Sequence, residues 1–163
     1  MNLIVTIENR FARTPDGRVW TQATFAYPFW MRYLTVFDHV RVVARVRAVT
    51  SVPPQWGRAD GAQVSFEPVP YYVGPWQYIL QARRVRRSIE NAIRSDSDGA
   101  VIMRVGSQIA ATVEPLLRSS DHPYGLEVIG DPFNVFSPGA LNHPLRPFFR
   151  WSFSRQLRRQ CGG

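Results

Sequence analysis

Residues 99–132, GAVIMRVGSQIAATVEPLLRSSDHPYGLEVIGDP, decide the fold of this chain. The apolar run 100–105 is typical of a β-strand and stops at Gly106. The next segment has the apolar spacing of one buried helix face, with Ile109, Val113, Leu116 and Leu117 in register. A second apolar run, 126–129, follows a polar turn. Strand, helix and strand in so short a stretch form a βαβ unit, which predicts a parallel sheet.

Ligands of open α/β sheets bind beyond the carboxyl ends of the strands. In this unit those ends are Arg104–Ser107, which includes Gly106, and Gly130–Pro132. Ser107 is expected to cap the helix by accepting a backbone N–H of its first turn. Asp131 is either a ligand contact or the side chain of an Asx-turn, and the sequence leaves both open.

Glu127 lies inside an otherwise apolar strand. Burying a carboxylate costs several kcal/mol unless it is paired. We therefore expect a structural ion pair with Arg104 on the neighbouring strand, and a role in a binding site is the alternative.

The rest of the chain supplies further strands and helices around this unit. Strands are predicted at 3–7, 40–49 and 64–69, and helices at 24–37, 76–94 and 145–160. The stretch Glu8–Thr21 is polar, contains the turn Thr14-Pro15-Asp16-Gly17, and is predicted to be a loop. The fold class is therefore α/β: one Rossmann-like domain over 1–163, with a mostly parallel sheet and helices on both faces. Because no strand follows the last helix, we expect the domain to be truncated before its final strand.

The net charge of the chain indicates which classes of binding partner to expect. The formal net charge is +8, and all 20 basic residues are arginine. A positive field of this size favours phosphate-bearing substrates, nucleic acid or an anionic membrane face. The start of the chain lacks a signal peptide and no apolar run is long enough to span a bilayer, so the expected location is cytoplasmic, with a peripheral place at the inner membrane face. Cys161, the single cysteine, excludes a disulfide scaffold.

Several catalytic motifs are absent. The chain has neither the glycine-rich dinucleotide fingerprint nor a P-loop, and no nucleophile elbow. His39, His122 and His143 are scattered away from clustered carboxylates. We therefore expect no metal site and no bound cofactor, and the residues that would catalyse a reaction are unknown.

Two arginine-rich helices have alternative interpretations. The arginines over 83–94 form either a solvated helix face or an interaction surface. The Phe, Trp and Arg residues of 145–160 indicate either a core helix with a basic rim or a helix that lies on a membrane.

Two runs carry a resemblance to a known family. They are NLIVTIENRFARTPDGRVWTQATFAYPFWMRYL, residues 2–34, and HPYGLEVIGDPFNVFSPGALNHPLRPFFRWSFSRQLRRQC, residues 122–161. They resemble the amino-terminal domain of family-four glycosyltransferases of the GT-B fold, of the bacterial and cyanobacterial type that builds surface or exported polysaccharide. The resemblance implies a domain that holds the acceptor. It also implies that the nucleotide-sugar donor binds to a second, carboxyl-terminal domain, which carries the family's E-x7-E element and is not in this sequence.

Two functions follow as expectations. In the first, the chain is the acceptor-binding portion of a glycosyltransferase, inactive alone, that serves a polysaccharide or lipid-linked acceptor. Its expected substrate-binding residues are Arg10, Arg13, Arg104, Gly106, Ser107, Gly130 and Asp131. In the second, it is a non-catalytic basic module for an anionic membrane, or less readily nucleic acid, because no nucleic-acid-binding signature is present. An uncovered sheet edge predicts self-association.

Overall fold

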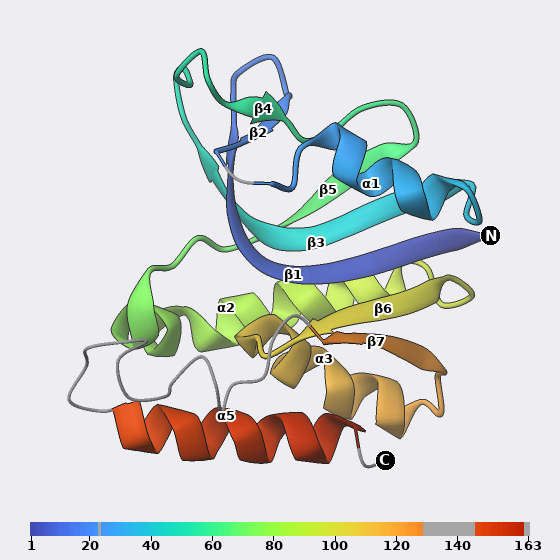
Figure 1. The fold of residues 1–163 in the computed structure, drawn as a ribbon, viewed down its shortest axis with the longest axis vertical. Coiled ribbons are helices and arrows are strands. Elements are labelled where there is room, and N and C mark those ends of the chain that lie inside the picture. Colours follow the sequence, from blue (N-terminus) through green and yellow to red (C-terminus); the bar gives the residue numbers. More distant parts are fainter. Residues whose placement is uncertain (23, 129–145, 162–163) are drawn as a thin grey trace.

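The computed structural model describes residues 1–22, 24–128 and 146–161, which form one sheet with helices packed against it (Figure 1). The strands are β1 (Asn2–Arg13), β2 (Val19–Thr21), β3 (His39–Ala48), β4 (Gly57–Arg58), β5 (Val64–Val69), β6 (Ala100–Val105) and β7 (Tyr124–Val128). The helices are α1 (Tyr27–Leu34), α2 (Gly74–Arg94), α3 (Gln108–Ser119) and α5 (Arg146–Cys161).

Five strands form a parallel core in the spatial order β5-β3-β1-β6-β7. The chain builds outward from β1 in one direction through β3 and β5, and then in the other through β6 and β7. The order of the strands therefore reverses between β1 and β6, and this is where open α/β sheets bind ligands. The two short strands β2 and β4 add an antiparallel extension at the end of β1, which makes the sheet mixed.

Side chains alternate across the parallel core and build a hydrophobic layer on each face. On one face, Leu3 and Val5 pack with Trp30 of α1. On the other, Ile4 packs with Ile89 of α2 and with residues of α3. Helices therefore cover both faces of the sheet, as the sequence predicts.

Helix α5 lies against α3 on the side away from the sheet (Figure 1). Leu157 packs on the edge of the hydrophobic layer, and Arg159 reaches Glu114 Oε2 at 3.3 Å. Glu114 also pairs with Arg118 on its own helix at 3.0 Å. This pairing explains how the Glu114 carboxylate is tolerated at 3% exposure.

The structure confirms the central βαβ unit. Strands at 64–69 and 100–105 have the predicted bounds, and β3 begins one residue before its prediction. Helix α3 begins directly after Ser107, whose hydroxyl oxygen accepts from the Ala110 N–H at 3.0 Å, as predicted for the cap. Helix α1 is shorter than the predicted 24–37, because it begins after Ala26 without a side-chain cap.

The prediction of a loop over Glu8–Thr21 is wrong. Strand β1 continues to Arg13, pairing with β3 along its second half, and only then turns. The turn itself is the one predicted, since the Gly17 N–H donates to the Thr14 carbonyl at 2.9 Å. The polar residues of 8–13 look like a loop in sequence, yet they belong to a strand because the segment pairs with β3 and the side chains of Glu8 and Arg13 contact other elements.

Some predictions lie outside the described residues, among them the sites at Gly130 and Asp131. Among the described strands, β7 pairs only with β6 and forms one end of the sheet. Self-association through this edge stays a prediction.

The packing of α1 generates a stability prediction. Trp30 is fully buried among aromatic rings, with Phe29 and Phe66 edge-on to it. Trp30→Ala should lower the free energy of unfolding by about 3–5 kcal/mol, because it opens a large cavity. Urea unfolding followed by circular dichroism measures the change. The matched control is Met31→Ala on the exposed side of the same helix, where a loss of less than about 0.5 kcal/mol is expected. Equal losses would contradict the observed orientation of α1.

Candidate functional site

A break in the pairing of β1 lies beside the switch point between β1 and β6, where open α/β sheets have their ligand-binding crevice at the carboxyl edge. Thr6 pairs with Val43 and Arg10 pairs with Arg45, so the segment of β1 between these pairs contains more residues than the segment of β3 opposite it. Such a β-bulge bends a strand and re-aims its side chains. Here it directs Glu8 toward the start of α3.

Glu8 occupies the place where this type of fold receives an anion. Its Oε2 accepts the backbone N–H of Ile109, in the first turn of α3, at 3.0 Å. Its Oε1 accepts the hydroxyl of Tyr72 at 2.6 Å and lies 3.5 Å from Arg45 Nε. A carboxylate is stabilised by the free N–H groups and the positive dipole end of a helix. The protein therefore supplies the anion at this helix terminus from its own chain.

Arg45 and Tyr72 hold this carboxylate in place. Arg45 Nε donates to the backbone carbonyl of Glu8 at 2.9 Å, and its NH1 group donates to the carbonyl of Tyr72 at 2.8 Å. The guanidinium also lies over the Tyr72 ring, 4.6 Å from the ring centre. Burial, and then the negative charge of Glu8, raise the pKa of Tyr72 well above its ordinary value. Tyr72 is therefore a hydrogen-bond donor at physiological pH.

Gly106 forms the turn from β6 into α3. Its φ of +86° lies in the left-handed region, which glycine adopts without strain. This turn brings the first N–H groups of α3 to the crevice, where Ser107 and Glu8 each accept one. Gly106 thus shapes the start of α3 through its backbone and Ser107 through its hydroxyl, and a binding role for Gly106 stays a prediction.

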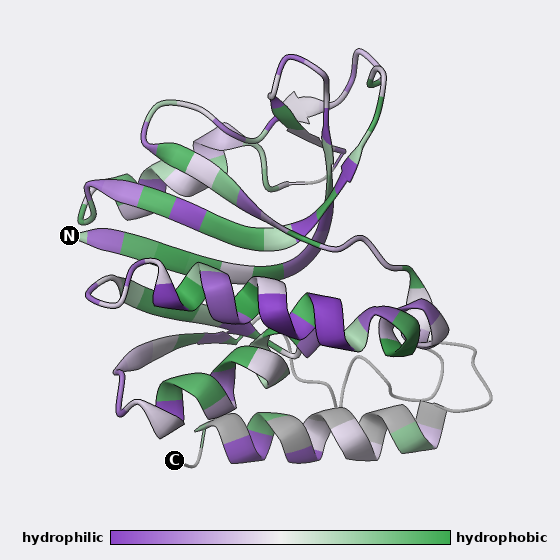
Figure 2. Ribbon diagram, turned by 180° about the vertical axis from the view of Figure 1, so that it is seen from behind, coloured by the Kyte–Doolittle hydropathy of each residue, from purple (hydrophilic) through white to green (hydrophobic). Residues whose placement is uncertain are grey.

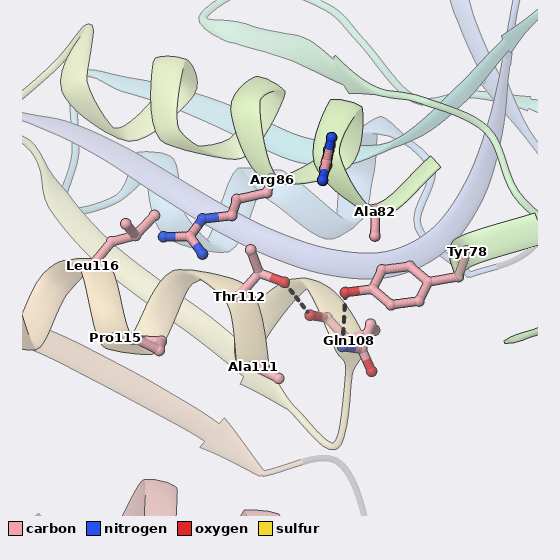
Figure 3. A pocket seen from close by; sticks show the side chains of 9 residues that line it. Tyr78, Ala82, Arg86, Gln108, Ala111, Thr112, Pro115 and Leu116 are labelled. Atoms are coloured by element: carbon pink, nitrogen blue, oxygen red, sulfur yellow. Dashed lines mark hydrogen bonds between the residues drawn. The ribbon is translucent and has the colours of Figure 1, made fainter. Parts of the chain in front are cut away.

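An open groove adjoins this crevice between α2 and α3. Figure 3 shows its lining: Tyr78, Ala82, Arg83 and Arg86 from α2, and Gln108, Ala111, Thr112, Pro115 and Leu116 from α3. Its volume is about 360 Å³. At one end, Gln108 Nε2 donates to the Tyr78 hydroxyl at 3.0 Å, and the Tyr78 ring lies 5.2 Å from that of Tyr72. The groove and the Glu8 crevice are therefore neighbouring parts of one site.

The groove has the chemistry to hold a polar, anionic molecule. Arg86 extends between the two helices (Figure 3), and its Nε donates to Glu90 Oε1 at 2.7 Å. This contact orients the guanidinium and leaves its terminal nitrogens for another acceptor. Arg83 adds a second positive charge on the same side, while Gln108 and Thr112 bring an amide and a hydroxyl. Arginine with such polar groups suits phosphate or carboxylate on a hydroxyl-rich ligand.

Arg104 and Glu127 form the predicted ion pair. Arg104 NH1 lies 3.0 Å from Glu127 Oε2, and Arg104 is only 5% exposed. Two further hydrogen-bond donors to Glu127 come from α1 and were not predicted from the sequence. Arg32 donates to Glu127 Oε1 and the Tyr33 hydroxyl donates to Glu127 Oε2, each at 2.8 Å. The Arg104 guanidinium also lies within about 5 Å of the Phe25 and Phe29 ring centres. The pair fastens β6 and β7 to α1.

The structure does not bring the predicted site residues into one cluster. Arg104 turns to the α1 face of the sheet, whereas Ser107 caps α3 on the other face. Arg13 donates to the carbonyl of Phe66 at 3.1 Å, also on the α1 face, and Arg10 is exposed. Gly130 and Asp131 lie outside the described residues. A binding role for these residues stays a prediction.

Sequence reasoning missed Glu8, Arg45 and Tyr72 as a cluster. One signal was present: Glu8 directly follows the buried run 3–7, so it marks a strand position beside the carboxyl edge. Arg45 and Tyr72 gave no such signal, since their roles depend on contacts across 37 and 64 positions of the chain.

Other features of the described residues are less suited to be the site. A second cavity, of about 410 Å³, lies at the amino ends of β6 and β7, the edge opposite the crevice. Within residues 1–22, 24–128 and 146–161, no group of three or more His, Cys, Asp or Glu side chains could hold a metal ion. In the same part of the chain, no helix combines the length and the apolar character needed to cross a bilayer.

Comparison with known proteins gives one informative similarity. The chain is 28% identical over 112 residues to Protein CapJ of Staphylococcus aureus. The aligned region covers 69% of this chain but only 28% of CapJ, so the chain spans less than a third of that relative. No protein-family model matches the chain, and no solved structure matches it.

The Glu127 contacts generate a second prediction. Glu127→Ala should lower the free energy of unfolding by about 3 kcal/mol, because it leaves the buried Arg104 guanidinium without its carboxylate. Arg32→Ala removes a donor from the same carboxylate but on the exposed side, so a loss below about 1 kcal/mol is expected. Urea unfolding of both variants shows whether the buried Arg104–Glu127 pair contributes more to the free energy of unfolding than the exposed Arg32–Glu127 contact does. Similar losses in the two would favour the surface network.

The Tyr72 hydroxyl generates a pH prediction. Its pKa is raised in the folded protein, so stability is fully present below the ordinary tyrosine pKa of 10.0 and is lost as the pH rises above it. Tyr72→Phe should be less stable at neutral pH by about 1 kcal/mol, the value of one lost hydrogen bond. It should also lose stability less steeply than the native chain between about pH 10 and 12. Urea unfolding across this range tests both parts, and identical slopes would show that Tyr72 is not protected from ionisation.

Proposed function

We propose that this chain is the acceptor-binding part of a glycosyltransferase that acts in polysaccharide biosynthesis. The observation that carries the proposal is the basic groove between α2 and α3, whose Tyr78–Gln108 end lies near the carboxyl edge of the sheet, where the strand order reverses. The similarity to CapJ, a capsule biosynthesis protein, supports the biological process. The resemblance to the amino-terminal domain of GT-B glycosyltransferases supports the type of reaction.

Glu8 favours acceptor binding over donor binding in this domain. A nucleotide-sugar diphosphate needs free N–H groups and positive charge at a helix terminus. Here the Ile109 N–H already donates to the Glu8 carboxylate, and Arg45 already forms an ion pair with it. A second anion at that point would meet like-charge repulsion. The donor is therefore expected to bind to another domain. In this domain the Glu8 contacts position α3, which forms one wall of the groove.

The groove residues have distinct roles in this proposal. Arg83 and Arg86 bind a phosphate or carboxylate on the acceptor by charge-assisted hydrogen bonds. The Tyr78–Gln108 pair and Thr112 orient sugar hydroxyls at the end nearest the crevice. Ala82, Ala111 and Pro115 offer small apolar contacts for the sugar ring. Holding the acceptor in one orientation contributes to the rate by lowering the entropic cost of transfer.

A test uses the complete protein in the organism that encodes it. Arg83→Ser with Arg86→Ser should reduce the amount of surface polysaccharide by about tenfold or more, because two charge-assisted contacts to the acceptor are lost. Quantitative sugar analysis of the cell surface measures this, with immunoblotting to show an unchanged protein level. The matched control, Arg18→Ser with Arg94→Ser, also removes two exposed arginines and should leave the polysaccharide unchanged. An unaltered polysaccharide in the groove variant would overturn the assignment of this groove.

A further inference from the structure

The outer surface of α2 is divided into two sides with different character. Arg83 and Arg86 belong to the side that lines the groove. Trp76, Leu80, Arg84 and Arg87 follow at intervals of four, four and three residues, so they share one stripe on the side that faces solvent. Figure 2 shows α2 crossing the near side of the molecule with this mixture of apolar and strongly polar residues.

The amino-terminal end of the stripe exposes large apolar side chains. Trp76 is 79% exposed and Leu80 is 85% exposed, and Val73 and Ile79 beside them are also solvent-accessible. Neighbouring exposed apolar groups of this size mark contact surfaces more often than single ones do. In Figure 1 this end of α2 projects at the carboxyl edge of the sheet, the edge that holds the crevice.

The charge beside the apolar end is entirely positive. Arg84 and Arg87 continue the stripe one to two turns further along, and no acidic residue falls on it. Glu90, the nearest acidic residue of the helix, is paired with Arg86 on the groove side. An apolar tip with tryptophan and leucine, followed by arginines without acidic partners, complements an anionic lipid surface.

We propose that α2 docks the protein on an anionic membrane, with Trp76 and Leu80 inserted at the interface and Arg84 and Arg87 at the lipid headgroups. Tryptophan suits the interface because its ring is apolar and its N–H is polar. The arginine stems pack on apolar surface while their charged ends remain in water. Arg86 extends into the groove and lies outside this contact, and Trp76, Leu80, Arg84 and Arg87 do not line the groove, so the inference does not depend on the proposed function of the groove.

The experiment is sedimentation of the full chain with vesicles. The vesicles contain about 30 mol% phosphatidylglycerol in phosphatidylcholine, and pure phosphatidylcholine vesicles serve as the neutral comparison. Binding at about 20 mM salt should exceed binding to neutral vesicles by at least about tenfold, and should weaken as the Debye length shortens toward about 8 Å at physiological salt. Equal binding to both vesicle types, or none at low salt, would overturn the proposal.

Paired variants locate the contact on the helix. Arg84→Ser with Arg87→Ser should weaken binding by about tenfold or more, while Arg18→Ser with Arg58→Ser, a matched loss of two exposed arginines at β2 and β4, should weaken it by only about threefold through the long-range field. Leu80→Asp should abolish binding, and Val36→Asp, at a residue of α1 that is 73% exposed, should not. Equal effects of the two arginine pairs would remove the outer stripe from the contact.

Three further readouts separate a membrane from other occupants of this surface. Brominated phosphatidylglycerol should quench tryptophan fluorescence in the native chain, and the quenching should fall in Trp76→Phe although binding persists. Light scattering should show the same molecular mass for the native chain and for Leu80→Asp. A lower mass in Leu80→Asp would assign the surface to a second copy of the chain. Tight binding of a DNA duplex that Arg84→Ser with Arg87→Ser abolishes and Leu80→Asp leaves intact would assign it to nucleic acid.

Discussion

The carboxylate of Glu8 is the contact on which the arrangement of the site depends. It comes from a bulge in the central strand and accepts the Ile109 N–H in the first turn of α3, while Tyr72 and Arg45 bring the segments after β5 and within β3 to the same point. One carboxylate thus satisfies a helix terminus, a buried hydroxyl and a guanidinium. Each of these groups would be costly to bury without a partner. The geometry of the groove follows from this shared anchor, because it fixes where α3 begins.

The two faces of the sheet have different roles: the α1 face holds a packed aromatic core, and the face covered by α2 and α3 carries the groove. On the α1 face, aromatic rings surround Trp30, and the Arg104–Glu127 pair closes their edge. The Glu127 carboxylate on that face is engaged by Arg104, Arg32 and Tyr33, whereas the buried Trp30 Nε1 and Arg104 Nε have no hydrogen-bond partner among the described residues. On the opposite face, α2 and α3 leave a groove whose arginines remain accessible. Helix α2 therefore presents one side to the groove and another to solvent, and this division separates the proposed acceptor site from the proposed membrane contact.

The positive charge of the chain acquires a location only in the folded protein. Several arginines form structural ion pairs: Arg45 pairs with Glu8, and Arg104 pairs with Glu127. Apart from Arg86, which pairs with Glu90, those of α2 extend from the helix toward solvent, because a helix with a single buried stripe leaves most of its circumference in water. Part of the arginine excess that favours anionic partners in the sequence is thus displayed on α2, which carries five of the 20 arginines.

The sequence by itself determined the parallel βαβ unit, the cap at Ser107 and the pairing of Glu127 with Arg104. These are local patterns, or follow from the cost of a lone carboxylate in an apolar strand. Only the tertiary structure decided that 8–13 are strand residues, because the segment pairs with β3, and Glu8 and Arg13 contact α3 and β5 rather than neighbours in sequence. It also decided the groove, since Arg86 and Thr112 meet across two helices whose separation depends on packing against the sheet. Spacing along a chain predicts which face of a helix is buried, but not which other helix lies beside it.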